Sequence, residues 1–231
     1  GNNCIITGTT LIQGCQNTII PNGVVTIATS AFRGHSKLKN IEIPSSVTSI
    51  ANTVFLYCSS LTSIEIPSSV TSIGGYVFSY CTSLANITVS EGNTVFNDGN
   101  GSNCIITGTT LRQGCQNTII PNEVTTISQD AFTGHSGLKS IEIPVNVTSI
   151  GGYAFMNCTS LSNVYVYNVT PFTLGANAFD NNAFGRKIYV PETNEATTVS
   201  NYTTATNWSS YSSAIAAMDL IFTFGDSAFS V

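Results

Sequence analysis

The stretch LTSIEIPSSVTSI, residues 61–73, decides the fold because close copies of it recur along the chain at a fixed interval. The interval is 23 residues in both halves of the chain, as shown by Pro21, Pro44 and Pro67 and by Pro121 and Pro144. A constant period of roughly 20 to 50 residues is the signature of a solenoid, a propeller or another array of repeated units. The chain is therefore expected to consist of stacked coils.

Apolar residues fall into columns when the sequence is aligned on this period. The largest columns hold Leu38, Leu61, Leu84, Leu138 and Leu161, then Ile41, Ile64, Ile87, Ile141 and Val164, and finally Phe32, Phe55, Phe78, Phe132 and Phe155. The Ile-Glu-Ile pattern alternates apolar and polar residues as a half-buried strand does, and the proline ends the strand because it has no N–H to donate. A helical or 3₁₀ turn is expected to follow at Gly-Gly-Tyr-x-Phe. One coil cannot bury its own apolar side, so we expect coils to stack about 4.8 Å apart.

The full repeat reads Leu-x-x-Ile-x-Ile-Pro-x-x-Val-Thr-Ser-Ile-Gly-x-x-x-Phe-x-x-Cys. It resembles the BspA-type leucine-rich repeat, which occurs in surface proteins of host-associated bacteria and some protists, and the resemblance covers nearly the whole chain. It implies a β-rich repeat solenoid of the α/β leucine-rich-repeat type, a right-handed stack of coils of about 23 residues with a parallel sheet. Two β-hairpin insertions and a C-terminal cap complete the expected fold.

A longer duplication is superimposed on the short repeat. Residues 1–22 and 101–122 are identical except at two positions, Asn2/Ser102 and Ile12/Arg112. We therefore expect one solenoid over residues 1–191, made of two modules, 1–100 and 101–191.

The segment between the modules is expected to decorate a coil and not to link independent domains. Residues 91–103 contain Asn-Asp-Gly-Asn-Gly at 97–101, a strong turn signal. Because residue 1 corresponds to a position just after this cluster, the first coil is expected to lack a neighbour.

Each module is predicted to contain a β-hairpin, Cys4–Ile12 and Cys104–Arg112. Gly8-Thr9 suits a type II′ turn, which would place Thr7 opposite Thr10 and Cys4 opposite Gln13. The chain has seven cysteines, so at least one is unpaired. A disulfide between Cys4 and Cys15, or between Cys104 and Cys115, stays open at this point.

The repeat decays after Val166, although residues 188–191 preserve a last coil. A helix with Asn207 as its N-cap is predicted from the spacing of Trp208, Tyr211, Ile215 and Met218. Residues 192–231 are therefore expected to cap the exposed end of the core, with a closing strand at 219–224. The family resemblance implies the same arrangement.

Composition narrows the classes of partner. Charged residues make up 8% of the chain and hydrophobic residues 42%, so Ser, Thr and Asn must cover the surface. A net charge of −5 without a basic patch argues against nucleic acid. No run reaches the roughly 18 apolar residues of a membrane span. We expect a monomer located extracellularly or at the cell surface, with its signal and anchor outside this chain.

The polar residues offer no complete catalytic or metal-binding set. His35 and His135 occupy the column that holds cysteine in other coils (Cys58, Cys81 and Cys158), so a structural role is expected for them. No further ligands stand at the spacing of a metal site, and no base accompanies a cysteine as a nucleophile would require. We expect no catalytic residue, no metal and no cofactor.

The outward positions of the strands are the candidate binding face. Two residues before each proline, or its replacement, stand Ile19, Glu42, Glu65, Thr88, Ile119, Glu142, Tyr165 and Tyr189, flanked by Lys39, Asn40, Lys139 and Asn163. These residues are expected to form one stripe, with Glu42 and Glu65 about 5 Å apart. Exposed Ile and Tyr suit a binding surface, whereas a merely solvated β-surface is the alternative interpretation.

The leading functional expectation is a non-enzymatic surface or secreted binding protein. The family resemblance implies adhesion to proteins of a host matrix or of another cell surface. Two alternatives stay open: a structural spacer that displays another domain, and a carbohydrate-binding module that uses Tyr165 and Tyr189.

Overall fold

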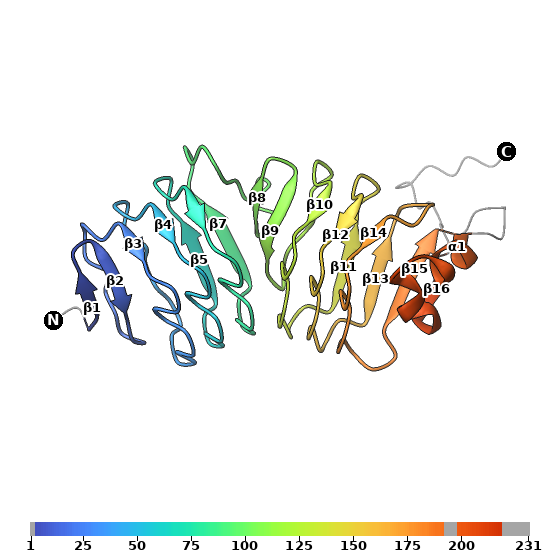
Figure 1. Ribbon diagram of the computed structural model, residues 1–231, viewed down its shortest axis with the longest axis horizontal. Helices are drawn as coiled ribbons and strands as arrows, with labels where there is room; N and C mark the ends of the chain where they lie inside the picture. The colour runs from blue at the N-terminus through green and yellow to red at the C-terminus, as the bar shows by residue number, and fades with distance from the viewer. Residues whose placement is uncertain (1–2, 192–197, 219–231) are drawn as a thin grey trace, which may run out of the picture.

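The computed structural model describes residues 3–191 and 198–218 and confirms a β-solenoid of about eight coils of about 23 residues. The described strands are β1 (Ile5–Thr7), β2 (Thr10–Gln13), β3 (Thr26–Ile27), β4 (Ser49–Ile50), β5 (Ser63–Ile66), β6 (Ser72–Ile73), β7 (Asn86–Val89), β8 (Cys104–Thr107), β9 (Thr110–Gly114), β10 (Thr126–Ile127), β11 (Ser140–Ile143), β12 (Ser149–Ile150), β13 (Asn163–Val166), β14 (Thr173–Leu174), β15 (Lys187–Pro191) and β16 (Ile215–Met218). The helices are α1 (Thr198–Thr204) and the 3₁₀ helix η1 (Trp208–Ala214). Coils follow one another along the long axis, from β1 at one end to α1 and β16 at the other (Figure 1).

The Ile-x-Ile segments form one side of the solenoid, here called the strand face. It comprises β5, β7, β11, β13 and β15 together with the aligned segments 18–20, 41–43 and 118–120. β5 pairs in parallel with β7, and β11, β13, β15 and β16 form a second parallel sheet. Side chains alternate as predicted: Ile64 and Ile66 are buried, and Glu65 between them is exposed. The predicted parallel pairing is confirmed.

The other side of each coil carries shorter strands, most of them two residues long. They form two five-stranded sheets, in the orders β1-β2-β3-β4-β6 and β14-β12-β10-β9-β8. Ile27 pairs with Ile50 and Ile50 with Ile73, so the register again follows the repeat. Both sides therefore stack coil on coil.

A stack of phenylalanine rings occupies the core but does not run the whole length. Phe32, Phe55 and Phe78 form one run, with ring centroids 5.4 and 5.6 Å apart. Phe132, Phe155 and Phe179 form the other, at 4.7 and 5.2 Å. The buried apolar residues likewise form two clusters, which meet at the β8–β9 hairpin. The predicted ladder is thus correct within each module and is interrupted where the hairpin enters.

The turns after the short strands differ from the helical or 3₁₀ turn predicted there. Each instead passes through left-handed residues, such as Tyr57 (φ 65°), Tyr80 (φ 59°) and Asn157 (φ 61°). Bonds to the next coil hold these turns: the N–H of Tyr57 donates to the carbonyl of Ser79 at 3.1 Å, and that of Asn157 to Asp180 at 2.9 Å. The ladder between coils, and not a local helix, fixes the turn.

Both predicted hairpins are present, with one change of register. Thr107 lies opposite Thr110 as expected, but a bulge between Ile105 and Ile106 places Cys104 opposite Gly114 instead of Gln113. Gly108 has a φ of 56°, as a type II′ turn requires at its first central residue. All seven cysteines carry free thiols, so neither candidate disulfide is formed.

A glycine lets each hairpin pack against the first full coil of its module. An added Cβ on Gly114 would lie 2.0 Å from the ring of Phe132, and one on Gly14 would lie 2.1 Å from Phe32. Only glycine allows this close approach without displacing the ring. The glycines therefore bring the short hairpin coil into contact with the phenylalanine stack.

The C-terminal cap is built differently from the predicted long helix. Of the four residues from which the helix was predicted, Trp208 and Tyr211 lie in η1. Ile215 and Met218 lie in β16, which pairs with β15 at the end of the sheet. Asn207 does stand before η1, but its side chain donates to the carbonyl of Leu174 at 2.6 Å and makes no cap bond. The strand predicted at 219–224 lies outside the described residues.

Two aromatic residues of the cap seal the last coil. Trp208 is fully buried, and its indole N–H donates to the carbonyl of Phe172 at 2.8 Å. The hydroxyl of Tyr211 accepts a bond from the N–H of Phe179 and donates to Asp180. The cap thus covers the end of the second phenylalanine stack.

Replacing Phe55 by Ala is expected to lower the free energy of unfolding by about 3–5 kcal/mol, because it removes a ring stacked on both faces and leaves a cavity. Phe184, which is fully exposed, supplies the control. Its change to Ala is expected to alter stability by no more than about 0.5 kcal/mol. Urea unfolding of both variants measures the difference, and equal losses would contradict the stacked core.

Candidate binding face

The C-terminal half of the strand face brings three of the predicted stripe residues into one row. Parallel pairing places Glu142 beside Tyr165 and Tyr165 beside Tyr189. The two tyrosine rings stack, with centroids 5.1 Å apart and planes 14° from parallel. Glu142 is exposed and both tyrosines are half-buried, so the row presents a carboxylate next to an aromatic pair.

The N-terminal half presents a more polar row. Glu65 lies beside Thr88, and both are exposed. The hydroxyl of Ser90 donates to the Glu65 carboxylate at 2.6 Å. Residues 41–43, which carry Glu42, belong to no ladder in the described structure, so the paired-strand geometry behind the predicted Glu42–Glu65 spacing is absent.

The stripe is not continuous, contrary to expectation. The turn cluster of the insertion lies between Thr88 and Ile119: the Asp98 carboxylate accepts the N–H of Val89 at 3.3 Å, and the carbonyl of Ser102 accepts the N–H of Ile119 at 3.1 Å. The turn signal at residues 97–101 indicated an insertion that decorates a coil, but it could not show that the insertion enters the strand face. The face is therefore divided into two separate surfaces.

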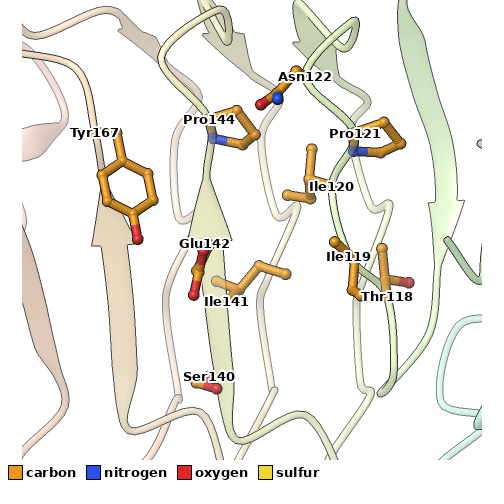
Figure 2. A pocket seen from close by; sticks show the side chains of 10 residues that line it. All are labelled: Thr118, Ile119, Ile120, Pro121, Asn122, Ser140, Ile141, Glu142, Pro144 and Tyr167. Atoms are coloured by element: carbon orange, nitrogen blue, oxygen red, sulfur yellow. The ribbon is translucent and has the colours of Figure 1, made fainter. Parts of the chain in front are cut away.

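Shallow hollows open on this face where neighbouring segments are not paired. One of them measures about 540 Å³ and lies between segment 118–120 and β11 (Figure 2). Its lining comprises Thr118, Ile119, Ile120, Pro121, Asn122, Ser140, Ile141, Glu142, Pro144 and Tyr167. The first module repeats it at about 550 Å³, with Ile19 in place of Ile119 and Glu42 in place of Glu142. A third hollow of about 420 Å³ contains both Glu42 and Glu65.

Charge and apolar surface adjoin in the hollow of Figure 2. Ile119 is 71% exposed, and Ile19 in the equivalent hollow is 72% exposed. Across the hollow, burial and the nearby Glu142 carboxylate raise the pKa of Tyr167. Its hydroxyl is therefore a neutral hydrogen-bond donor at physiological pH. The arrangement can hold an apolar side chain together with a donor or cationic group.

The flanking residues lie at the entrance to the strands. Lys39 and Lys139 are exposed, and their carbonyls accept the N–H groups of Thr62 and Ser162 in the next coil. The Thr62 hydroxyl lies 3.3 Å from Asn40 and donates to its side-chain oxygen. Asn163 pairs with Lys187 across the ladder. These residues frame the face and are themselves held by the stack.

The histidine and cysteine column lies inside the stack, except that His35 is half-buried. The thiols of Cys58 and Cys158 donate to the carbonyls of Phe32 and Phe132 in the preceding coil, both at 3.0 Å. Burial raises the pKa of both thiols to about 12, so they stay protonated and are poor nucleophiles. His135 fills the same column and is 1% exposed.

Sequence reasoning missed a second group of exposed aromatic residues. Tyr57, Tyr76 and Tyr153 sit at left-handed turn positions and are 37–45% exposed. The Tyr57 ring stacks on Tyr80 at 4.7 Å. The signal was available, because the column of Tyr57 and Tyr80 holds Gly or Asn in other coils, which are typical of left-handed backbone.

Other site chemistry is limited within the parts of the chain that are described. Residues 3–191 and 198–218 contain no group of three or more His, Cys, Asp or Glu placed to hold a metal ion. None of the helices in these ranges has the length and apolar character needed to cross a lipid bilayer.

The coils, the phenylalanine stacks and the strand face together define a leucine-rich-repeat solenoid. The chain belongs to the family described as "BspA type Leucine rich repeat region (6 copies)", whose pattern matches residues 12–117 and 112–231. A comparison with curated proteins gives no match.

Among solved structures, the chain is similar to other leucine-rich-repeat proteins. A leucine rich cell surface protein from Faecalibacterium prausnitzii is 26% identical with a TM-score of 0.59, over 75% of this chain and 53% of that one. The chain thus spans about half the length of that relative. A leucine-rich repeat protein from T. pallidum is 22% identical with a TM-score of 0.42, over 74% of this chain and 80% of that one.

Buried His135 predicts a pH dependence of stability. Burial lowers the pKa of His135 from 6.5 to about 4, and the nearby backbone of Cys81 opposes this shift in part. Neither ring nitrogen makes a well-formed hydrogen bond in the described structure. Between pH 6.5 and about 4, His135 therefore binds a proton in the unfolded chain but not in the folded chain. Stability is full above pH 6.5 and falls by about 3 kcal/mol as the pH drops towards 4.

His135→Cys, which restores the residue found in other coils, is expected to remove that part of the acid destabilisation. Urea unfolding at several pH values between 7 and 4 compares the two proteins. Identical pH profiles would show that His135 takes up its proton in the folded state.

Proposed function

We propose that this protein is a non-enzymatic surface or secreted binding protein that recognises a partner protein on a host matrix or another cell surface. The strand face in the C-terminal module makes the contact. Its centre is the hollow between Ile119 and β11, and the stacked Tyr165 and Tyr189 extend it towards the cap.

The observation that carries the proposal is the exposure of Ile119 at a rim shared with Glu142 and Tyr167. An isoleucine that is 71% exposed gains free energy when a partner covers it. Protein interfaces combine such apolar anchors with tyrosine hydroxyls and a polar rim. On a surface otherwise rich in Ser, Thr and Asn, this is the arrangement that a protein partner fits.

Family and location support the same function. The F. prausnitzii relative is described as a cell surface protein, which favours a surface location for this chain as well. The absence of catalysis is supported by the protonated, buried thiols of Cys58 and Cys158. A glycan is the weaker partner, because Tyr165 and Tyr189 use one ring face each for their mutual stacking.

The proposal is tested by surface plasmon resonance against purified extracellular-matrix proteins and a panel of polysaccharides. Ile119→Asp combined with Tyr165→Ala is expected to weaken binding to the captured protein at least about tenfold, which corresponds to a loss of about 1.4 kcal/mol. Thermal unfolding of the single variant Ile119→Asp should change little, since Ile119 is mostly exposed.

Phe184→Ala is the matched control, because it removes an exposed aromatic residue that lines none of the hollows on the strand face. It should leave binding unchanged. Unaltered capture by the double variant would exclude this face, and capture of polysaccharides alone would exclude a protein partner.

A further inference from the structure

The two hairpins have nearly the same sequence but very different environments. Ile105 and Ile106 in β8 are fully buried, whereas Ile5 and Ile6 in β1 are 58% and 37% exposed. Cys104 and Cys115 are buried, while Cys4 and Cys15 are only half-buried. A single cause explains the difference: the last coil of the first module covers β8, and no described segment covers β1 (Figure 1).

The last coil of the first module, here called the covering coil, forms backbone hydrogen bonds with the second hairpin. Ile106 and Asn97 exchange two hydrogen bonds, at 2.8 and 3.0 Å, in an antiparallel bridge. The Gln116 N–H donates to the carbonyl of Leu84 at 3.2 Å, and the thiol of Cys115 donates to that of Ala85 at 3.1 Å. The covering coil therefore binds the hairpin through main-chain hydrogen bonds as well as through apolar contact.

The turn of the covering coil fits over a glycine. The N–H of Tyr80 donates to the carbonyl of Thr133 at 3.0 Å. A Cβ on Gly134 would lie 2.5 Å from the Tyr80 ring, so only glycine admits the ring there. Asn157 then donates from its side chain to the Tyr80 hydroxyl at 2.6 Å. The ring of Tyr80 thus bridges the junction between the modules.

The first module has the same receiving residues. Ile6, Cys15 and Gln16 match Ile106, Cys115 and Gln116, and Gly34 matches Gly134. Gly34 has the same φ of 76° as Gly134, but the space beside it is open, with no heavy atom within 4 Å of an added Cβ. The surface that accepts a coil in the second module is thus repeated at the first hairpin.

We infer that the outer face of the first hairpin coil, formed by Cys4, Ile5, Ile6, Cys15 and Gly34, is a docking surface for the last coil of another leucine-rich-repeat module. The docking coil has a sequence similar to residues 77–98. Its equivalent of Tyr80 packs over Gly34, and its equivalent of Phe96-Asn97 pairs with Ile6. A second copy of this chain offers no such coil, because its own second module covers the first and α1, η1 and β16 cover the far end.

The rim of the surface adds a selective element. Arg33 and Lys37 stand where the second module has Thr133 and Gly137, and both are exposed. The docked coil must leave room for two cationic side chains near its turn, and carboxylates there would favour it. The main-chain contacts are unaffected, because Thr133 takes part through its carbonyl.

Thiol labelling of an extended chain tests the inference. Residues 1–100, with Ser at the Cys4 and Cys15 positions of the added copy, are placed directly before Gly1, which reproduces the Asn100–Gly101 junction. Iodoacetamide labelling of Cys4 and Cys15 in the original chain is expected to be fast, and in the extended chain these two thiols should be lost from the labelled set, like Cys104 and Cys115. Unchanged labelling in the extended chain would overturn the inference.

A matched pair of substitutions separates docking from non-specific protection. Ile5→Asp should leave the melting temperature of the original chain nearly unchanged, whereas Ile105→Asp should lower it strongly. In the extended chain, Ile5→Asp is made in the original segment and not in the added copy. It should lower the melting temperature as much as Ile105→Asp and restore labelling of Cys4. Analytical ultracentrifugation of the original chain completes the test: a dimer that protects Cys4 would show that a second copy is the occupant, which contradicts the inference.

Discussion

Contact between successive coils is the constraint on which the structure depends. A single coil of about 23 residues has an apolar side that it cannot bury alone, and its turn contains left-handed residues that no local helix supports. The neighbouring coil supplies both the phenylalanine partner for the ring and the carbonyl for the turn. Burial, backbone pairing and turn conformation are therefore satisfied by the same neighbour, coil after coil.

The same constraint makes every interruption important. The insertion at 91–103 and the hairpin that follows break the phenylalanine stack, divide the apolar core into two clusters and split the strand face. Contacts specific to this place compensate, such as Tyr80 over Gly134 and Asn97 against Ile106. The two modules are joined by these contacts and by Ile105 and Cys115, which pack into the apolar cluster of the first module. Only the phenylalanine rings do not stack across the junction.

Most of the fold could be predicted because one period places the same residue type at the same point of every coil. Columns such as Phe55, Phe78 and Phe155 identify the core, and Glu65 between two isoleucines identifies the outward side. The 3₁₀ form of η1 and the division of the stripe could not be predicted, because each depends on a contact made once. The bulge that both hairpins share could not be predicted either, because the turn residues alone fix only the pairs next to the turn. Tyr167 joins the hollow only because its neighbours there, Ile119 and Glu142, come from other coils.

The left-handed turn positions also govern how the outer edge of the solenoid can diversify. Their backbone is held by hydrogen bonds between coils, so the side chain attached there is not needed to keep the turn closed. A non-glycine residue in this conformation costs on the order of 1–2 kcal/mol, and asparagine costs less than tyrosine. The three tyrosines at such positions away from the module junction, Tyr57, Tyr76 and Tyr153, therefore represent tolerated strain, and this edge can exchange aromatic for amide side chains while the scaffold beneath it keeps its shape.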